Sequence, residues 1–242
     1  MIRSSRTDAV VTIELDRAEK RNALNEEMLS GLSDAFSAAV DGDARAIVLT
    51  GRGPVFSAGA DLTGPVYDLG FLDGVMTLME KIESVPVPVI AAVSGGAIGA
   101  GLQLAMAADL RVLTPGTLVA IPAAKLGVSV DEWTIRRLVT LVGAGQARNL
   151  LIGCETLSAE RGLELGFTNR IGDLAAAQAW AAEIAELAPL TLQHYKMVLN
   201  AEAREKPAPE RVEAMERCWI SEDIEEGRAA RAAKRKPVFK GR

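Results

Sequence analysis

Apolar residues recur along the chain with two periods, one typical of strands and one typical of helices. The run Ala46–Leu49 is continuously apolar, as in strands that are covered on both faces. Strands are expected at residues 10–15, 45–50, 87–93 and 109–113. Helical spacing separates them at about 26–40, where Asn25 is a candidate N-cap, and at about 71–84. Strands separated by helices predict βαβ units around a mostly parallel sheet.

The second half of the chain has a different pattern. From residue 134 onward the spacing is helical throughout. Ser158 is a candidate cap for a helix over 159–165, and the alanine-rich stretch 175–188 favours helix by propensity. A last helical block is expected at about 210–233. We therefore predict a core over residues 1–190 and a C-terminal helical region over residues 191–242.

Composition narrows the class of protein. A chain of 242 residues, 49% of them hydrophobic, is long enough for one sizeable core. The net charge of −5 gives no support to nucleic-acid binding. Cys154 and Cys218 are too few and too far apart for a disulfide scaffold, no His/Cys cluster suggests a metal, and no signal peptide is recognisable. A reduced, cytoplasmic setting is expected.

The uncharged stretch 84–108 is long enough to span a bilayer. Pro86, Pro88 and four glycines interrupt it. We interpret it as a buried strand, a glycine turn and a buried helix, so no transmembrane segment is predicted.

Two glycine-containing loops are candidates for chemistry. Residues 56–62 read Phe-Ser-Ala-Gly-Ala-Asp-Leu, and a second loop begins at Gly95 and leads to Asp109. Each is predicted to end a strand and precede a helix, which exposes N–H groups at a helix N-terminus and favours partial negative charge there. Two such groups from separate loops, converging on one point, form an oxyanion hole for a thioester carbonyl.

These two segments resemble the paired oxyanion-hole loops of the crotonase (enoyl-CoA hydratase/isomerase) family. The resemblance covers nearly the whole chain and implies an α/β fold, the crotonase (ClpP-like) ββα spiral core with a C-terminal helical region. It implies an acyl-CoA thioester as ligand or substrate, no further cofactor, and a homotrimer or hexamer. It assigns the oxyanion donors to the N–H groups of Ala58 and Ala100, where Ala100 stands in place of the usual glycine.

Other acyl-CoA contacts follow from the same resemblance. Residues 17–25 look like the family's early loop beside the CoA adenine and pantetheine. The basic tail from Lys234 looks like a terminal segment whose lysine reaches the CoA phosphate of an adjacent subunit, although a solvated tail is the alternative. The implied contact residues are Arg21, Ala23, Ala60, Asp61, Leu62, Gln103, Ala123, Trp133 and Lys234.

The catalytic positions depart from the family's hydratases. Those enzymes carry one glutamate in the helix after the second loop and another twenty residues on, and here the two places hold Gln103 and Ala123. An amide hydrogen-bonds water but exchanges no proton at neutral pH, and a methyl group does neither. Losing one acid–base group costs roughly 10² to 10⁴ in rate. Little hydratase activity is expected.

One carboxylate remains near these positions. Some family members, including dienoyl-CoA isomerases and an aryl-CoA dehalogenase, carry an aspartate eight residues beyond the second glutamate position, which is Asp131 here. Asp131 and Glu132 are therefore candidate catalytic groups. The alternative is that Asp131 caps a helix over 132–141, with Glu132 in its first turn. Trp133 is interpreted as a pocket wall or a core aromatic, and His194 as a surface or core residue.

The combination of Gln103, Ala123 and the stretch 131–138 resembles a mycobacterial subgroup of enoyl-CoA hydratase homologues, which is associated with binding long acyl-CoA for mycolic acid supply. This resemblance implies an acyl-CoA-binding protein of fatty-acid or mycolic-acid metabolism, without hydratase activity and with a lipid-pathway protein as a further partner. The alternatives are an enoyl-CoA isomerase that uses Asp131 or Glu132, and a residual or assisted hydratase.

Overall fold

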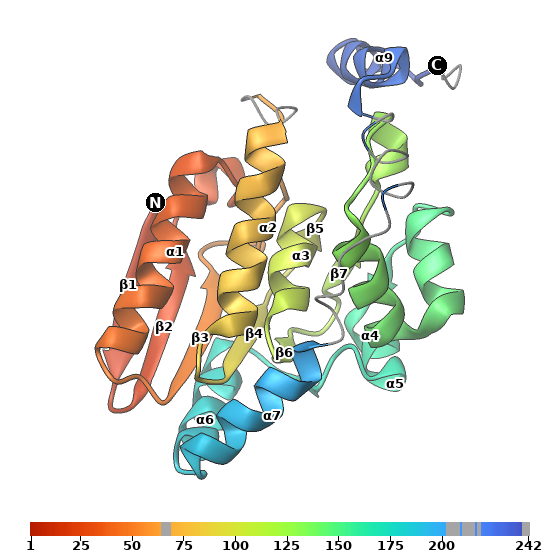
Figure 1. Ribbon diagram of the computed structural model, residues 1–242. Coiled ribbons are helices and arrows are strands. Elements are labelled where there is room, and N and C mark those ends of the chain that lie inside the picture. The colour runs from red at the N-terminus through yellow and green to blue at the C-terminus, as the bar shows by residue number, and fades with distance from the viewer. Residues whose placement is uncertain (64–68, 202–208, 210–215, 217–218, 239–242) are drawn as a thin grey trace.

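A six-stranded sheet forms the centre of the structure (Figure 1). The computed structural model describes residues 1–63, 69–201, 209, 216 and 219–238. The strands, in spatial order, are β1 (Ile2–Thr7), β2 (Val10–Leu15), β3 (Ala46–Gly51), β4 (Val89–Val93), β6 (Leu110–Leu113) and β9 (Arg170–Ile171). Only the β1–β2 pair is antiparallel. The expected mostly parallel sheet is confirmed, with boundaries shifted by a residue or two.

A second, three-stranded sheet comprises β5 (Gly96–Ile98), β7 (Leu118–Ala120) and β8 (Leu157–Ser158). The expectation that the chain is helical throughout after residue 134 is therefore wrong, because β8 and β9 lie in that region. Each of these strands has two residues, which is too short to show a strand period in the sequence.

Helices cover both faces of the large sheet (Figure 1). The core side chains at positions 47, 49, 89 and 91 belong to one cluster, which includes α1 (Glu26–Asp41), α2 (Leu69–Ser84) and α3 (Ala100–Ala107). The alternate positions 46, 48, 90 and 92 pack against α6 (Leu174–Ala185). Alternation along a strand places the two sets on opposite faces. The Asn25 side chain accepts from Met28 N–H at 3.0 Å, so the predicted N-cap of α1 is confirmed.

Further helices follow the two sheets. Two 3₁₀ turns, η1 (Ala18–Lys20) and η2 (Ala123–Leu126), border the early loop and the start of the second half. The later helices are α4 (Glu132–Leu151), α5 (Ala159–Leu165), α7 (Pro189–Ala201) and α9 (Glu222–Ala232). Gly143, at φ 76°, kinks α4, and Ser158 caps α5 as predicted. β4 and α3 are buried throughout, which confirms the strand, turn and helix interpretation of residues 84–108.

The two C-terminal helices pack on different parts of the chain. α7 buries Lys196 and Asn200 against the region of α2, whereas α9 lies on η2 beyond the edge of the sheets (Figure 1). A Cβ at Gly127 would lie 2.4 Å from Asp223 O, and one at Gly227 would lie 2.2 Å from Leu126 O, so this contact requires glycine on both sides. α7 crosses residue 190, and the division of the chain at that point stays a prediction.

Some predicted features fall outside the described residues. These are residues 210–215 and 217–218 of the last helical block, which include Cys218, and residues 239–242 of the basic tail. Within the described part of the chain, none of the helices combines the length and the apolar character that a membrane crossing needs.

Candidate functional site

The second glycine loop ends in the N-terminus of α3. Gly99 precedes the helix with φ 53° and ψ −120°, a backbone conformation that residues other than glycine rarely adopt. Its carbonyl accepts from the N–H groups of Leu102 and Gln103, and the Ala100 N–H has no partner within the described residues. Ala100 is the first helical residue and its φ is not positive, so its methyl group costs no strain. The Ala100 N–H is thus available as a donor.

The first glycine loop offers a different N–H from the one predicted. Ala58 N–H already donates to Arg21 O at 2.9 Å, so the assignment of Ala58 as an oxyanion donor is wrong for this structure. Leu24 N–H donates to Gly59 O at 2.7 Å and Asp61 N–H donates to Leu24 O at 2.8 Å. These two bonds form a parallel β-bridge between Leu24 and Ala60, in which the Ala60 N–H points away from Leu24. Within the described part of the chain, the Ala60 N–H has no hydrogen-bond partner.

Gly59 brings the two loops together. Its φ is 92°, and a Cβ at this position would lie 2.5 Å from Ile98 O and 3.5 Å from Ala100 N. Only glycine permits so close an approach. The available N–H groups of Ala60 and Ala100 therefore come from two loops that touch at Gly59, which is the arrangement an oxyanion hole needs.

Asp61 and Asn22 hold the early loop in place. Asp61 accepts from Arg17 Nη1 at 2.7 Å and from the Thr63 hydroxyl at 2.6 Å. The Thr63 hydroxyl, followed by Arg17, lowers the pKa of Asp61 to about 2 against the opposing effect of burial. Asn22, fully buried, donates from Nδ2 to the carbonyls of Arg52 and Val55, both at 2.9 Å. These contacts make Asp61 a support of the loop rather than an acid or base.

A cavity of about 690 Å³ lies beside the two loops. Its wall includes Ala60 and Ala100, part of α2, η2, and Trp219 and Arg231 from the C-terminal region. The predicted site residues that line it are Arg21, Ala23, Ala58, Ala60, Asp61, Leu62, Ala100, Gln103, Ala123 and Asp131. Three others, Glu132, Trp133 and Lys234, are not part of this wall.

Gln103 and Asp131 meet on the cavity wall. Asp131 is the N-cap of α4, and its carboxylate accepts from the Thr134 N–H at 2.8 Å and from the Thr134 hydroxyl at 2.6 Å. Gln103 Nε2 donates to Asp131 Oδ2 at 3.1 Å and to the Thr134 hydroxyl oxygen at 2.6 Å. The capping role of Asp131 is confirmed, and its carboxylate also lines the cavity.

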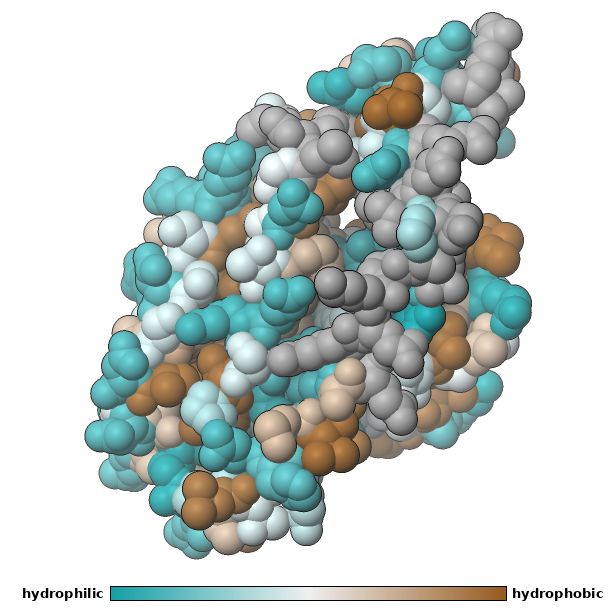
Figure 2. Space-filling view, in the orientation of Figure 1, coloured by the Kyte–Doolittle hydropathy of each residue, from teal (hydrophilic) through white to brown (hydrophobic). Residues whose placement is uncertain are grey.

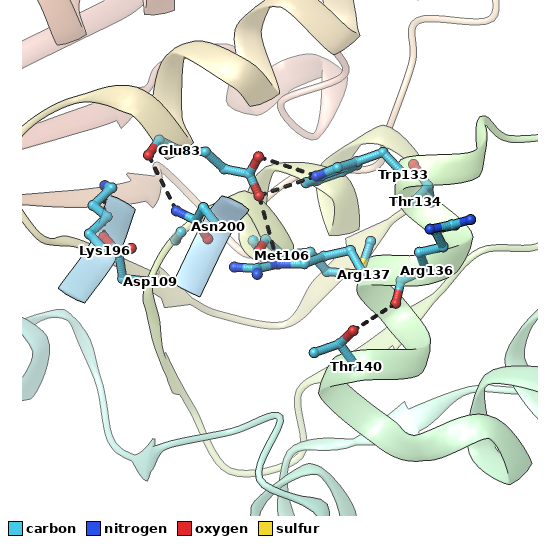
Figure 3. Close-up of polar contacts among 12 residues, drawn as sticks. Glu83, Met106, Asp109, Trp133, Thr134, Arg136, Arg137, Thr140, Lys196 and Asn200 are labelled. Atoms are coloured by element: carbon cyan, nitrogen blue, oxygen red, sulfur yellow. Dashed lines mark hydrogen bonds and ion pairs between the residues drawn. The ribbon is translucent and has the colours of Figure 1, made fainter. Parts of the chain in front are cut away.

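Trp133 and Glu132 point to other partners. Trp133 Nε1 lies 3.2 Å from both oxygens of Glu83 on α2, and Figure 3 shows the indole directed at that carboxylate. Trp133 thus packs on the core, which is one of its two predicted roles, and it does not line the cavity; its contact with acyl-CoA stays a prediction. Glu132 pairs with Arg136, one turn along α4, at 2.6 Å. That geometry does not place Glu132 as an acid or base in the cavity.

Two cationic side chains, the buried Arg111 and the partly buried Arg137, bind carbonyl groups at the C-terminal end of α3. Arg111 donates from Nε to Phe167 O at 2.7 Å and from Nη1 to Ala108 O at 2.8 Å, and burial lowers its pKa to about 9. Arg137 donates from Nε to Met106 O at 3.0 Å (Figure 3). Cations stabilise the C-terminal end of a helix dipole. The wholly buried α3 is therefore held at one end while the other end faces the cavity.

Lys234 lies in a second, separate hollow. It is exposed and lines this hollow together with Lys125, Ile152, Cys154 and Lys236. The predicted contact of Lys234 with the CoA of an adjacent subunit stays a prediction. His194 is exposed on α7, so of the two predicted roles, surface or core, the surface role is confirmed.

Several cavity residues were missed by the sequence reasoning. Arg231 sits in the last turn of α9, and Trp219 precedes that helix by three residues. Phe71 and Met76 contribute the face of α2 that borders the cavity. The helical spacing of Phe71 and Met76 shows that they lie on an apolar face, but not that this face borders a cavity. Arg231 is far from the glycine loops along the chain, so the sequence gives no sign that it lies beside them. Among the described residues, no group of three or more His, Cys, Asp or Glu side chains is placed to hold a metal ion.

Comparisons with known proteins show which sequences and structures this chain resembles. The family model described as enoyl-CoA hydratase/isomerase matches residues 5–242. A probable enoyl-CoA hydratase echA6 of Mycobacterium tuberculosis is 50% identical over 242 residues, covering 100% of both chains. The mitochondrial Δ(3,5)-Δ(2,4)-dienoyl-CoA isomerase of Mus musculus is 32% identical, over 78% of this chain and 65% of its own. A structure of methylmalonyl-CoA decarboxylase in complex with 2-nitronate-propionyl-CoA aligns with a TM-score of 0.90 and 25% identity, over 100% of this chain and 98% of that one.

Proposed function

The chain belongs to the enoyl-CoA hydratase/isomerase family, and from that membership we propose that it binds a fatty acyl-CoA thioester without hydrating it. The observation that carries this proposal is the pair of side chains at the two hydratase positions. Gln103 and Ala123 both line the cavity, and neither transfers a proton at neutral pH. Gln103 is also committed to Asp131 and Thr134 through its amide nitrogen.

The cavity suits the three parts of an acyl-CoA molecule. The N–H groups of Ala60 and Ala100, with the α3 dipole behind Ala100, are donors for the thioester carbonyl. Cationic side chains at the wall provide partners for the CoA phosphates, and apolar side chains provide a lining for the acyl chain. The cations are Lys20, Arg21 and Arg231, and the apolar residues include Leu62, Phe71, Val75, Met76, Leu126 and Val130.

We assign the protein to lipid metabolism in the cytoplasm, as a carrier for fatty-acid or mycolic-acid supply with a lipid-pathway enzyme as its partner. We further propose a homotrimer or hexamer. The exposed apolar residues of α7 support an assembly, since Leu190, Met197 and Leu199 are 64–78% exposed. Figure 2 shows apolar side chains at the surface over the lower part of this face, where Figure 1 places α6 and α7.

A second candidate function is enoyl-CoA isomerisation by Asp131. The observation that favours it is the position of this carboxylate on the cavity wall. The alternative through Glu132 is not retained, because Glu132 pairs with Arg136. Gln103 and both the N–H and the hydroxyl of Thr134 already donate to the Asp131 carboxylate, and this structural commitment favours the binding role.

Two measurements test the proposed function. Purified protein should show no hydration of crotonyl-CoA above background, and brisk hydration that Asp131→Asn leaves unchanged would refute the proposal. Calorimetry with a series of saturated acyl-CoA chains should give affinity that rises with length, by up to about 0.8 kcal/mol for each buried methylene. An affinity equal to that of free CoA at every length would mean that the acyl chain stays in solvent.

The isomerase candidate has its own measurement. If it is correct, wild-type protein converts a 3-enoyl-CoA at ordinary enzymic rates, on the order of 1–10³ per second, and Asp131→Asn does not. We expect no such conversion. The Asn variant keeps an N-cap, since Asn caps about as well as Asp, and a melting curve recorded beside the assay separates a loss of rate from a loss of folded protein.

A further inference from the structure

The side chains of Gln103, Asp131 and Thr134 are joined to one another by hydrogen bonds, and the Asp131 carboxylate is the main acceptor. Gln103 belongs to α3, Asp131 caps α4, and Thr134 lies in the first turn of α4. Gln103 is 7% exposed and Thr134 is fully buried. The carboxylate receives the Thr134 N–H, the Thr134 hydroxyl and the Gln103 amide. Thr134 is closed to water, whereas Asp131 is partly buried and lines the cavity.

The donors and acceptors among these three side chains decide whether residue 103 must donate or accept a hydrogen bond. The Thr134 hydroxyl has one proton, and it goes to Asp131 Oδ2 at 2.6 Å. The hydroxyl oxygen is then an acceptor for Gln103 Nε2, also at 2.6 Å. Asp131 is a second acceptor for the same nitrogen. Only the NH₂ side of the amide satisfies both, so position 103 requires a donor.

We propose that Asp131 is a specificity-determining residue, which excludes an ionised carboxylate from position 103 and so keeps the site from hydratase chemistry. Gln103 is then the required partner of Asp131, rather than simply a glutamate that has been lost. The structural part of the proposal stands alone, whereas its catalytic consequence rests on the proposed function. Of the two facing positions, 131 carries a carboxylate and 103 carries an amide.

The surrounding charges leave this pairing undisturbed. The charged side chains on the cavity wall are Glu19, Lys20, Arg21, Asp61, Asp73, Arg231 and Asp131 itself. Within the described part of the chain, none of the other six makes a hydrogen bond or ion pair with Gln103 or Asp131. α3 carries no charged residue, and on α4 Glu132 pairs with Arg136 and Arg137 with Glu83.

A glutamate at 103 would set two carboxylates about 3 Å apart, by analogy with the present amide contact. Two such groups do not both ionise, so one keeps its proton to a higher pH than usual. A pKa raised in the folded state stabilises the protein at low pH. That stability is lost as the pH rises from about 4.3, the usual value for Glu, to the raised value. Over this window the folding equilibrium constant falls by up to about tenfold per pH unit.

Exchanging both groups should restore the pairing. In Asp131→Asn, the amide oxygen keeps the cap on Thr134 N–H, and its NH₂ then faces the NH₂ of Gln103. Combining Gln103→Glu with Asp131→Asn sets a donor opposite an acceptor again, with the two groups interchanged. Each single substitution is therefore expected to destabilise, and the double variant is expected to be more stable than Gln103→Glu.

The test is a double-mutant cycle measured by chemical unfolding at a series of pH values between about 5 and 9. Gln103→Glu should lose stability with rising pH relative to wild type, and the double variant should not. Gln193→Glu, the same change at an exposed position of α7, is the matched control and should show no such loss. A Gln103→Glu profile parallel to wild type would overturn the proposal. So would a double variant no more stable than Gln103→Glu, including the case in which neither folds.

An activity measurement separates this inference from the proposed function. Gln103→Glu with Ala123→Glu should hydrate crotonyl-CoA at least tenfold more slowly at neutral pH than the triple variant that also carries Asp131→Asn. Equal rates above background in the two variants would count against Asp131 as the determinant. Hydration by wild type would refute the proposed function, while the unfolding cycle would still decide the pairing of residues 103 and 131.

Discussion

Asp61→Asn should loosen the loop that borders the cavity without removing a large side chain. Asp61 is 8% exposed, and its carboxylate accepts from Arg17 Nη1 at 2.7 Å and from the Thr63 hydroxyl at 2.6 Å. Asparagine keeps the shape but presents an NH₂ group to one of these donors. Arg17, whose side chain is 15% exposed, then loses its ion-pair partner. Both effects act on the segment that carries Ala60.

The shifted pKa gives the magnitude. The Thr63 hydroxyl and Arg17 lower the pKa of Asp61 from 3.8 to about 2. A shift of nearly two units corresponds to about 2.5 kcal/mol, and solvent at the cavity mouth reduces this to about 1–2 kcal/mol. Because the pKa is depressed in the folded state, this stability is present above pH 3.8 and is lost as the pH falls toward about 2.

Urea unfolding of wild type and Asp61→Asn at neutral pH measures the difference. We expect it to be about 1–2 kcal/mol, and to shrink when the pH is lowered below 3.8. Asp34→Asn, the same change at an exposed position of α1, is the control and should stay within about 0.5 kcal/mol of wild type. Equal stability of Asp61→Asn and wild type at neutral pH would show that the Arg17 and Thr63 contacts contribute nothing net.

Three further substitutions test the supports around the site. Arg111→Met leaves the carbonyls at the end of α3 without their buried donor, so unfolding in denaturant should become easier by about 3–5 kcal/mol, and full stability of this variant would contradict the role of Arg111. Lys196→Met breaks the 2.8 Å pair with Asp109, and amide exchange in α7 should accelerate more than in α1. Asp131→Ala removes the N-cap of α4 at a cost of about 0.5–2 kcal/mol in unfolding free energy, and a melting temperature equal to that of wild type would argue against the cap.

Much of the central architecture followed from local sequence patterns. The strand at 10–15 and the caps at Asn25, Asp131 and Ser158 agree with the structure, because period and capping depend on neighbouring residues. The absence of an acid–base group at positions 103 and 123 was also evident from the sequence, since side-chain identity alone decides whether a group can transfer a proton. β1 was not predicted, because it is a mostly polar edge strand that carries no apolar period.

Tertiary structure decided which groups face each other. Ala58 and Ala60 are equivalent small residues in the sequence, yet the Arg21 carbonyl takes the Ala58 N–H and a bridge to Leu24 directs the Ala60 N–H elsewhere. Gln103 and Asp131 are 28 residues apart, and only the packing of α3 on α4 sets their side chains 3.1 Å apart. The sequence by itself determined which protons the residues can hold. Hydrogen bonds between distant segments determined which of those groups remain available, because each donor and acceptor is consumed by whichever partner the fold places beside it.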